Sequence, residues 1–99
     1  MTLDSPIMKK IDSEKDVERT LCRYIKENGG MCIKLLCHQL IGLPDRLCLM
    51  PGGRVFFVET KTTGKKPSKI QNNVIGKIKN LGLDVYVIDS IENLKNIKI

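Results

Sequence analysis

The sequence predicts an α/β domain in which helices cover both faces of a mixed β-sheet. Two segments, residues 14–28 and 68–80, carry apolar residues at helical spacing and flank short apolar runs typical of strands. Both faces of the run 54–60 are apolar, as expected of a strand that is covered on both sides. The second helical segment lies between two strand-like runs and therefore permits a parallel crossover. A length of 99 residues and an apolar fraction of 41% predict one domain, residues 1–99, with a modest core.

The first helix is predicted to follow a loose lead-in of residues 1–11. The segment from Ser13 to Asp16 resembles a capping box, which predicts that the helix begins there. Gly29 and Gly30 predict where it ends. Its apolar side consists of Val17, Leu21, Tyr24 and Ile25.

Four apolar runs predict the strands, at residues 31–36, 46–50, 54–60 and 85–88. The tripeptide Pro51-Gly52-Gly53 lies between the second and third runs and predicts a hairpin. The predicted order is therefore helix, three strands, helix and strand, followed by a short last helix.

The second helix follows a basic loop, residues 62–67, and is predicted to begin at Pro67 or Ser68 and to end near Asn80. Ser90 is predicted to cap the short last helix, residues 91 to 96. The apolar stripe expected for the second helix consists of Ile70, Val74, Ile78 and Leu81.

The two motifs that suggest chemistry are Gly42-Leu43-Pro44-Asp45 and Glu59-Thr60-Lys61. The predicted hairpin brings Asp45 next to Glu59, and the period of a strand places Glu59 and Lys61 on one face. Two carboxylates about 4 Å apart repel by roughly 4 kcal/mol at an effective dielectric constant near 20. A bound cation relieves that repulsion, and oxygen ligands favour Mg²⁺ or Mn²⁺. The alternative is a surface Glu–Lys pair on an edge strand beside an aspartate that merely begins a strand.

Two further polar residues are predicted to face the hairpin end. Glu18 lies at the edge of the first helix's apolar stripe, and Glu14 has a similar position one turn earlier, so the sequence leaves open which of them contributes. Gln71 lies in the first turn of the second helix. The alternative for each glutamate is an ordinary solvated helix residue.

The net charge of +6 favours a polyanionic partner, of which nucleic acid is the obvious one. With two Tyr, two Phe and no Trp, the chain is poorly equipped to bind bases mainly by stacking. The predicted phosphate-binding surface consists of Lys65, Lys66, Lys69, Lys77 and Lys79, and its alternative is a solvated helix face.

No signal peptide and no apolar stretch of membrane-spanning length are visible, which predicts a cytoplasmic protein without a membrane partner. The four cysteines, Cys22, Cys32, Cys37 and Cys48, are then expected to be reduced core residues. A zinc site at Cys32, Cys37 and His38 is disfavoured, because a strand from Cys32 to Cys37 would point these cysteines to opposite sides.

In combination, these residues resemble the PD-(D/E)xK nuclease superfamily. They are Glu18-Arg19, Gly42-Leu43-Pro44-Asp45, Glu59-Thr60-Lys61 and Gln71. Within it, the chain from Glu14 to Ile91 is similar to the stand-alone VRR-NUC (virus-type replication-repair nuclease) domains of bacteriophages. The resemblance implies a restriction-endonuclease-like αβββαβ core with a mixed sheet flanked by helices.

The resemblance also implies roles for the site residues. Glu18, Asp45, Glu59 and the backbone carbonyl of Thr60 would hold Mg²⁺ or Mn²⁺, Lys61 would position the attacking water, and Gln71 would support the site. Small members of the family are similar to archaeal Holliday-junction resolvases and act as homodimers on branched DNA. If the chain is encoded by a phage, its place is the cytoplasm of the host.

The sequence therefore supports three hypotheses. The first is a metal-dependent endonuclease that cuts branched DNA, with four-way junctions as the expected target. The second is a nuclease with a broader or different DNA target, such as flaps, single strands or duplex. The third is a non-catalytic DNA-binding protein on a nuclease scaffold, which the four acid and lysine positions argue against, since carboxylates beside phosphates weaken binding.

Overall fold

The four strands form a single mixed sheet in the order β1-β2-β3-β4. This computed structural model describes residues 10–36 and 39–99. The elements are α1 (Glu14–Glu27), β1 (Met31–Lys34), β2 (Arg46–Met50), η2 (Pro51–Gly53), β3 (Arg54–Thr60), α2 (Lys69–Asn80), β4 (Asp84–Ile88) and η3 (Glu92–Asn96). Strands β1, β2 and β3 pair antiparallel, whereas β3 and β4 are parallel. The predicted mixed α/β fold, with α2 as the crossover, is confirmed.

The helices begin and end where local sequence signals predict. The Ser13 side chain accepts from the backbone N–H of Asp16, and Ser68 makes a full capping box with Gln71. At the end of α1, Gly29 adopts a φ of 84°, which glycine reaches without strain. Local sequence signals therefore fix the start of both helices and the end of α1.

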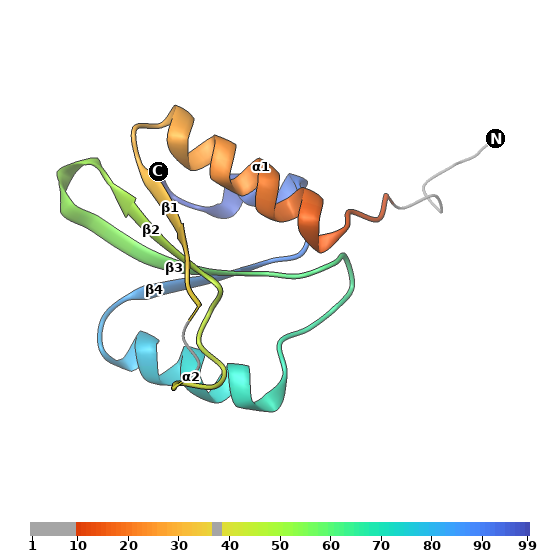
Figure 1. The fold of residues 1–99 in the computed structure, drawn as a ribbon, viewed down its shortest axis with the longest axis vertical. Helices are drawn as coiled ribbons and strands as arrows, with labels where there is room; N and C mark the ends of the chain where they lie inside the picture. The colour runs from red at the N-terminus through yellow and green to blue at the C-terminus, as the bar shows by residue number, and fades with distance from the viewer. Residues whose placement is uncertain (1–9, 37–38) are drawn as a thin grey trace.

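Helices cover both faces of the sheet (Figure 1). On one face α1 packs with η3 against the buried side chains of Phe56 and Val58. On the other face α2 packs against Val85 and Phe57. The apolar residues predicted on both faces of β3 therefore belong to two separate apolar clusters, one on each face of the sheet. The core of the first face consists of Val17, Leu21, Ile25, Cys48, Met50, Phe56, Val58, Ile88, Leu94 and Ile97.

Two predicted details of the elements are wrong. Strand β1 ends at Lys34, two residues before the predicted end. The stripe of α2 was expected to include Ile70 and Leu81, but these side chains are 56% and 83% exposed, and Ile75 is buried instead. The reason is that α2 packs into the cluster with Val85 through Val74, Ile75 and Ile78, whereas Ile70 in its first turn and Leu81 at its C-cap stay outside this cluster. The last helix is a 3-10 helix, with Ser90 accepting from the N–H of Asn93 as predicted.

The three described cysteines come from α1, β1 and β2, and the predicted core position holds for the buried Cys48, whereas Cys22 and Cys32 are half-buried. Cys22, Cys32 and Cys48 are free thiols, with Sγ–Sγ distances of 3.4 Å for the first pair and 4.0 Å for Cys32 and Cys48. Burial, together with the hydrogen bond to Cys32, raises the pKa of Cys22 to about 11, so this thiol stays protonated at neutral pH. Cys37 and His38, and residues 1–9 of the expected lead-in, lie outside the described residues.

Candidate active site

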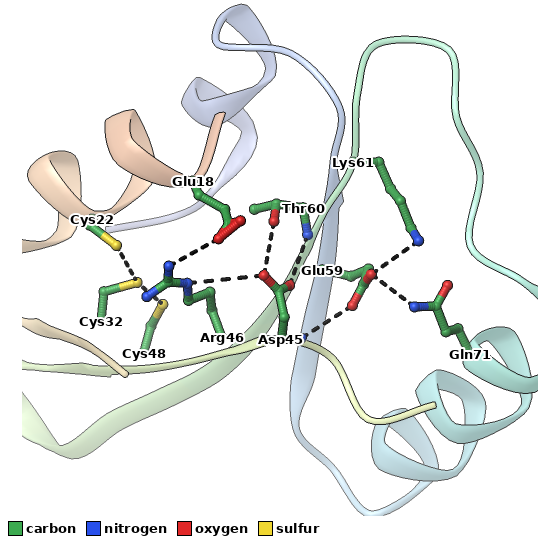
Figure 2. Close-up of polar contacts among 10 residues, drawn as sticks. All are labelled: Glu18, Cys22, Cys32, Asp45, Arg46, Cys48, Glu59, Thr60, Lys61 and Gln71. Atoms are coloured by element: carbon green, nitrogen blue, oxygen red, sulfur yellow. Dashed lines mark hydrogen bonds and ion pairs between the residues drawn. The ribbon is translucent and has the colours of Figure 1, made fainter. Parts of the chain in front are cut away.

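The backbone ladder between β2 and β3 ends at the pair Arg46 and Val58, and side chains continue the connection beyond it. The backbone N–H of Asp45 donates to Oε1 of Glu59 at 3.1 Å. In return, the backbone N–H and the hydroxyl of Thr60 donate to the two carboxylate oxygens of Asp45, at 3.1 and 3.0 Å. The two motifs predicted to converge are therefore joined by three hydrogen bonds (Figure 2).

The loop before Asp45 is held against α2. Gly42 has a φ of 92°, and a Cβ built on it would lie 2.9 Å from the carbonyl oxygen of Ile70. A larger residue would therefore be strained and would push the loop away from the helix. Gly42 thus lets the loop approach the first turn of α2, from which Gln71 reaches the site.

Glu59, Lys61 and Gln71 form one cluster on the α2 side. Lys61 Nζ lies 3.3 Å from Oε2 of Glu59, which confirms that the two side chains share a face. The Gln71 side-chain amide donates to the same oxygen at 3.0 Å. Glu59 is 4% exposed, and burial followed by the charge of Asp45 raises its pKa, while Lys61 opposes the rise.

A second acidic group lies on the α1 side of Asp45. One oxygen each from Glu14, Glu18 and Asp45 lie within 4.8 Å of one another. Burial and the neighbouring charges of Asp45 and Glu18 raise the pKa of Glu14. Both helix glutamates that the sequence left as alternatives are therefore brought to Asp45, while Glu59 reaches it from the other side.

Arg46 is the cation within this acidic group. Its Nη2 donates to Oε2 of Glu18 at 3.0 Å, and its Nε lies 4.0 Å from Oδ2 of Asp45. Arg46 was not predicted as a site residue, although its place directly after Asp45 at the start of a strand was a usable signal.

Basic side chains occur on two sides of the site. Lys65, Lys66, Lys69, Lys77 and Lys79 are exposed in and around α2, as expected of a phosphate-binding surface. A cavity of about 580 Å³ lies at α1 beside the acidic group, and its lining adds the basic side chains of Lys15, Arg19, Lys34 and Arg46 to Glu14, Glu18 and Cys22. This second basic surface was not predicted, because its residues are scattered over three elements.

Comparison with known proteins identifies the family. No family model matches the chain. The chain is 35% identical over 77 residues, 78% of its length, to "Putative nuclease p44" of Acyrthosiphon pisum secondary endosymbiont phage 1, of which it covers 83%. It is also similar to a solved VRR_NUC domain, with a TM-score of 0.79 and 25% identity over 86% of this chain and 94% of that one. The chain belongs to the VRR-NUC nuclease family. The resemblance predicted from its motifs is thereby confirmed, as is the fold that it implied.

The VRR-NUC chain is a nuclease by family, and its fold places the predicted residues together at one end of the sheet. In the described part of the chain, no helix is long and apolar enough to cross a membrane.

The Gln71 side chain connects a helix cap to the VRR-NUC site. Its oxygen accepts from the N–H of Ser68, while its amide nitrogen donates to Glu59. We expect Gln71→Glu to keep the cap but to place a carboxylate against Glu59, whereas Gln71→Ala loses both contacts. Gln71→Ala should cost about 1 kcal/mol of stability. Urea unfolding measures the contribution of Gln71 to the helix cap, and the cleavage rate measures its contribution to the site. If both variants lost the same stability and the same cleavage rate, the two contacts of Gln71 would not have separate roles.

Stability of the metal-free VRR-NUC chain should depend on pH through Glu59. Its pKa is raised on folding, so the folded state holds this proton more tightly than the unfolded chain. The resulting stabilisation is full below the ordinary carboxyl pKa and is lost as pH rises through the raised value. Thermal unfolding in EDTA from about pH 4 to about pH 8 should show the wild type losing stability relative to Glu59→Gln. A constant or opposite difference would contradict the assigned cause.

Proposed function

We propose that this VRR-NUC chain is a metal-dependent endonuclease that hydrolyses phosphodiester bonds in branched DNA, with four-way junctions as its target. The observation that carries the proposal is the convergence of Asp45, Glu59 and Lys61 at the end of the sheet, beside Glu14 and Glu18 of α1. The names of the related proteins, a phage nuclease and a VRR_NUC domain, support the same class of activity.

The donor atoms of the site fit a hard divalent cation. The nearest candidate ligands are all carboxylate oxygens, three of which lie within 4.8 Å of one another. Burial, followed by the charges of neighbouring carboxylates, raises the pKa values of Glu14 and Glu59, and a bound cation would oppose both effects. We propose that Mg²⁺ or Mn²⁺ is held by Glu18, Asp45, Glu59 and the Thr60 carbonyl, with Glu14 as a further carboxylate. A bound ion would polarise the phosphate and make a water molecule more acidic.

We assign the remaining roles in the reaction to side chains around the proposed metal. Thr60 orients Asp45 by two hydrogen bonds, and Gln71 holds Glu59 in place. We assign Lys61 to positioning the attacking water and to stabilising negative charge on the phosphate. The Lys61 side chain is 18% exposed and its ammonium lies beside Glu59, so it is held near the carboxylates.

The proposed DNA contacts come from the exposed lysines of α2 and the loop before it, Lys65, Lys66, Lys69 and Lys77, in a chain of net charge +6. A homodimer would present two active sites to the two strands of a symmetric junction. A chain of 99 residues leaves little room for a separate sequence-reading module, which favours recognition of DNA shape. We place this activity in the host cytoplasm, since the curated relative is a phage protein.

Cleavage of labelled four-way junction, flap, single-stranded and duplex DNA, each with Mg²⁺, Mn²⁺ or EDTA, tests the proposal. We expect paired, symmetric cuts in the junction with either metal and none with EDTA. Cleavage of several DNA structures would keep the nuclease but replace the junction by a broader target. Tight binding without cleavage under all conditions would refute the enzyme and leave a DNA-binding protein on a nuclease fold.

A further inference from the structure

Arg46 lies between two of the carboxylates proposed to hold the metal. It is the first residue of β2, and its side chain is 14% exposed. Figure 2 shows the guanidinium between Glu18 of α1 and Asp45, on the side of Asp45 opposite to Glu59 and Lys61. Arg46 therefore contacts the acidic group from the start of a strand.

The contact between Arg46 and Asp45 is electrostatic without being a hydrogen bond. The Nε–Oδ2 distance of 4.0 Å exceeds hydrogen-bond range, and this buried Nε has no hydrogen-bond partner in the described part of the chain. A buried donor without an acceptor is costly, so the contact with Asp45 holds this side chain by charge alone, while Nη2 keeps its hydrogen bond to Glu18. Its position follows the negative charge of the carboxylates.

The three carboxylates depend on that charge when no metal is bound. Glu14, Glu18 and Asp45 lie close enough to repel one another, with Glu14 exposed and the other two half-buried. In the described residues, the ion pairs of Glu18 and Asp45 are those with Arg46, whereas Glu14 is in no ion pair. Arg46 thus offsets part of the repulsion that a divalent cation would otherwise remove.

We propose that Arg46 is an internal counter-ion that holds the carboxylates of the metal-free enzyme and competes with the divalent cation for them. This inference rests on the proposed metal site. An ion that takes the oxygen of Glu18 weakens its bond to Arg46 and leaves two cationic groups in close proximity. Arg46 therefore stabilises the metal-free fold and lowers the affinity for metal.

The test is the dissociation constant of Mn²⁺, measured by calorimetry in the absence of DNA, for the wild type and two charge-removing variants. Arg46→Met removes the charge, and Arg46→Gln removes it while keeping an amide that can donate to Glu18. Arg54→Met is the matched control, since Arg54 also pairs with a carboxylate, Asp84, but lies at the other end of the hairpin. Thermal unfolding in EDTA and in Mn²⁺ is measured on the same proteins.

We expect both Arg46 variants to bind Mn²⁺ more tightly than the wild type, by on the order of tenfold, and Arg54→Met to bind as the wild type does. The Arg46 variants should also unfold at a lower temperature in EDTA and gain more from Mn²⁺. Variants that fold only with Mn²⁺ would support the proposal as well.

Unchanged or weaker Mn²⁺ binding by the Arg46 variants would overturn the inference while leaving the metal site intact. Insolubility of both variants with and without Mn²⁺ would overturn it too, because Arg46 would then be a structural residue. If the wild type neither binds Mn²⁺ nor cleaves DNA, the proposed function itself fails.

Discussion

Replacing Lys61 by alanine should lower the rate of DNA cleavage by roughly 10² to 10⁴-fold. The ammonium lies 3.3 Å from Glu59 in the proposed reaction centre, and no other lysine in the described chain pairs with a site carboxylate. Glu59→Gln should have a similar effect by removing a carboxylate charge from the site. Single-turnover cleavage at saturating enzyme measures the chemical step, and filter binding in EDTA should show DNA affinity close to that of the wild type.

The matched control for Lys61 is Lys77→Ala, because Lys77 is an exposed lysine on α2. Loss of one phosphate contact should weaken DNA binding and lower its salt dependence by about one unit of slope, without changing the saturated rate. Near-normal turnover in Lys61→Ala would remove Lys61 from the proposed mechanism. An equal loss of DNA binding in both variants would reduce Lys61 to another phosphate contact.

Replacing Phe56 by alanine should destabilise the fold by about 3 to 5 kcal/mol. Phe56 has no solvent exposure, and its ring packs edge-to-face on Tyr86, with centroids 5.4 Å apart, beneath the Arg54 guanidinium. Small domains are stable by only about 5 to 15 kcal/mol, so this variant should approach the limit of folding. Urea unfolding gives the free-energy difference.

The control for Phe56 is Val87→Ala, a smaller truncation on the same sheet at a side chain that is 39% exposed. It should change the free energy of unfolding much less, because solvent replaces the lost contacts. A loss below about 1 kcal/mol for Phe56→Ala would mean that the core closes around the deletion, against the packing described here.

Local patterns were sufficient to predict the elements and the central pairing of the site. Glycines and caps marked the ends of both helices, and the hairpin signal at Pro51-Gly52-Gly53 brought Asp45 to Glu59. The period of a strand placed Lys61 on the face of Glu59. These features depend on neighbours a few residues apart, which is why the sequence carries them.

Features that depend on packing between distant elements were not predictable. The pairing of Arg46 with Glu18 requires the distance and rotation of α1 over the sheet. The same holds for the exposure of Ile70 and Leu81, since helical spacing gives the stripe of α2 but not where the helix crosses the strands. The convergence of both helix glutamates on Asp45 is likewise a result of tertiary packing.

The most direct test of the proposed metal site is the anomalous scattering of Mn²⁺ in crystals of the wild type. We expect a peak about 2.0 to 2.3 Å from oxygen atoms of Glu18, Asp45 and Glu59, the proposed carboxylate ligands. The peak should be absent in Asp45→Asn crystals that retain the fold. If the wild-type protein cleaves DNA in Mn²⁺ but its crystals hold the ion elsewhere, or hold none, the proposed metal site is wrong.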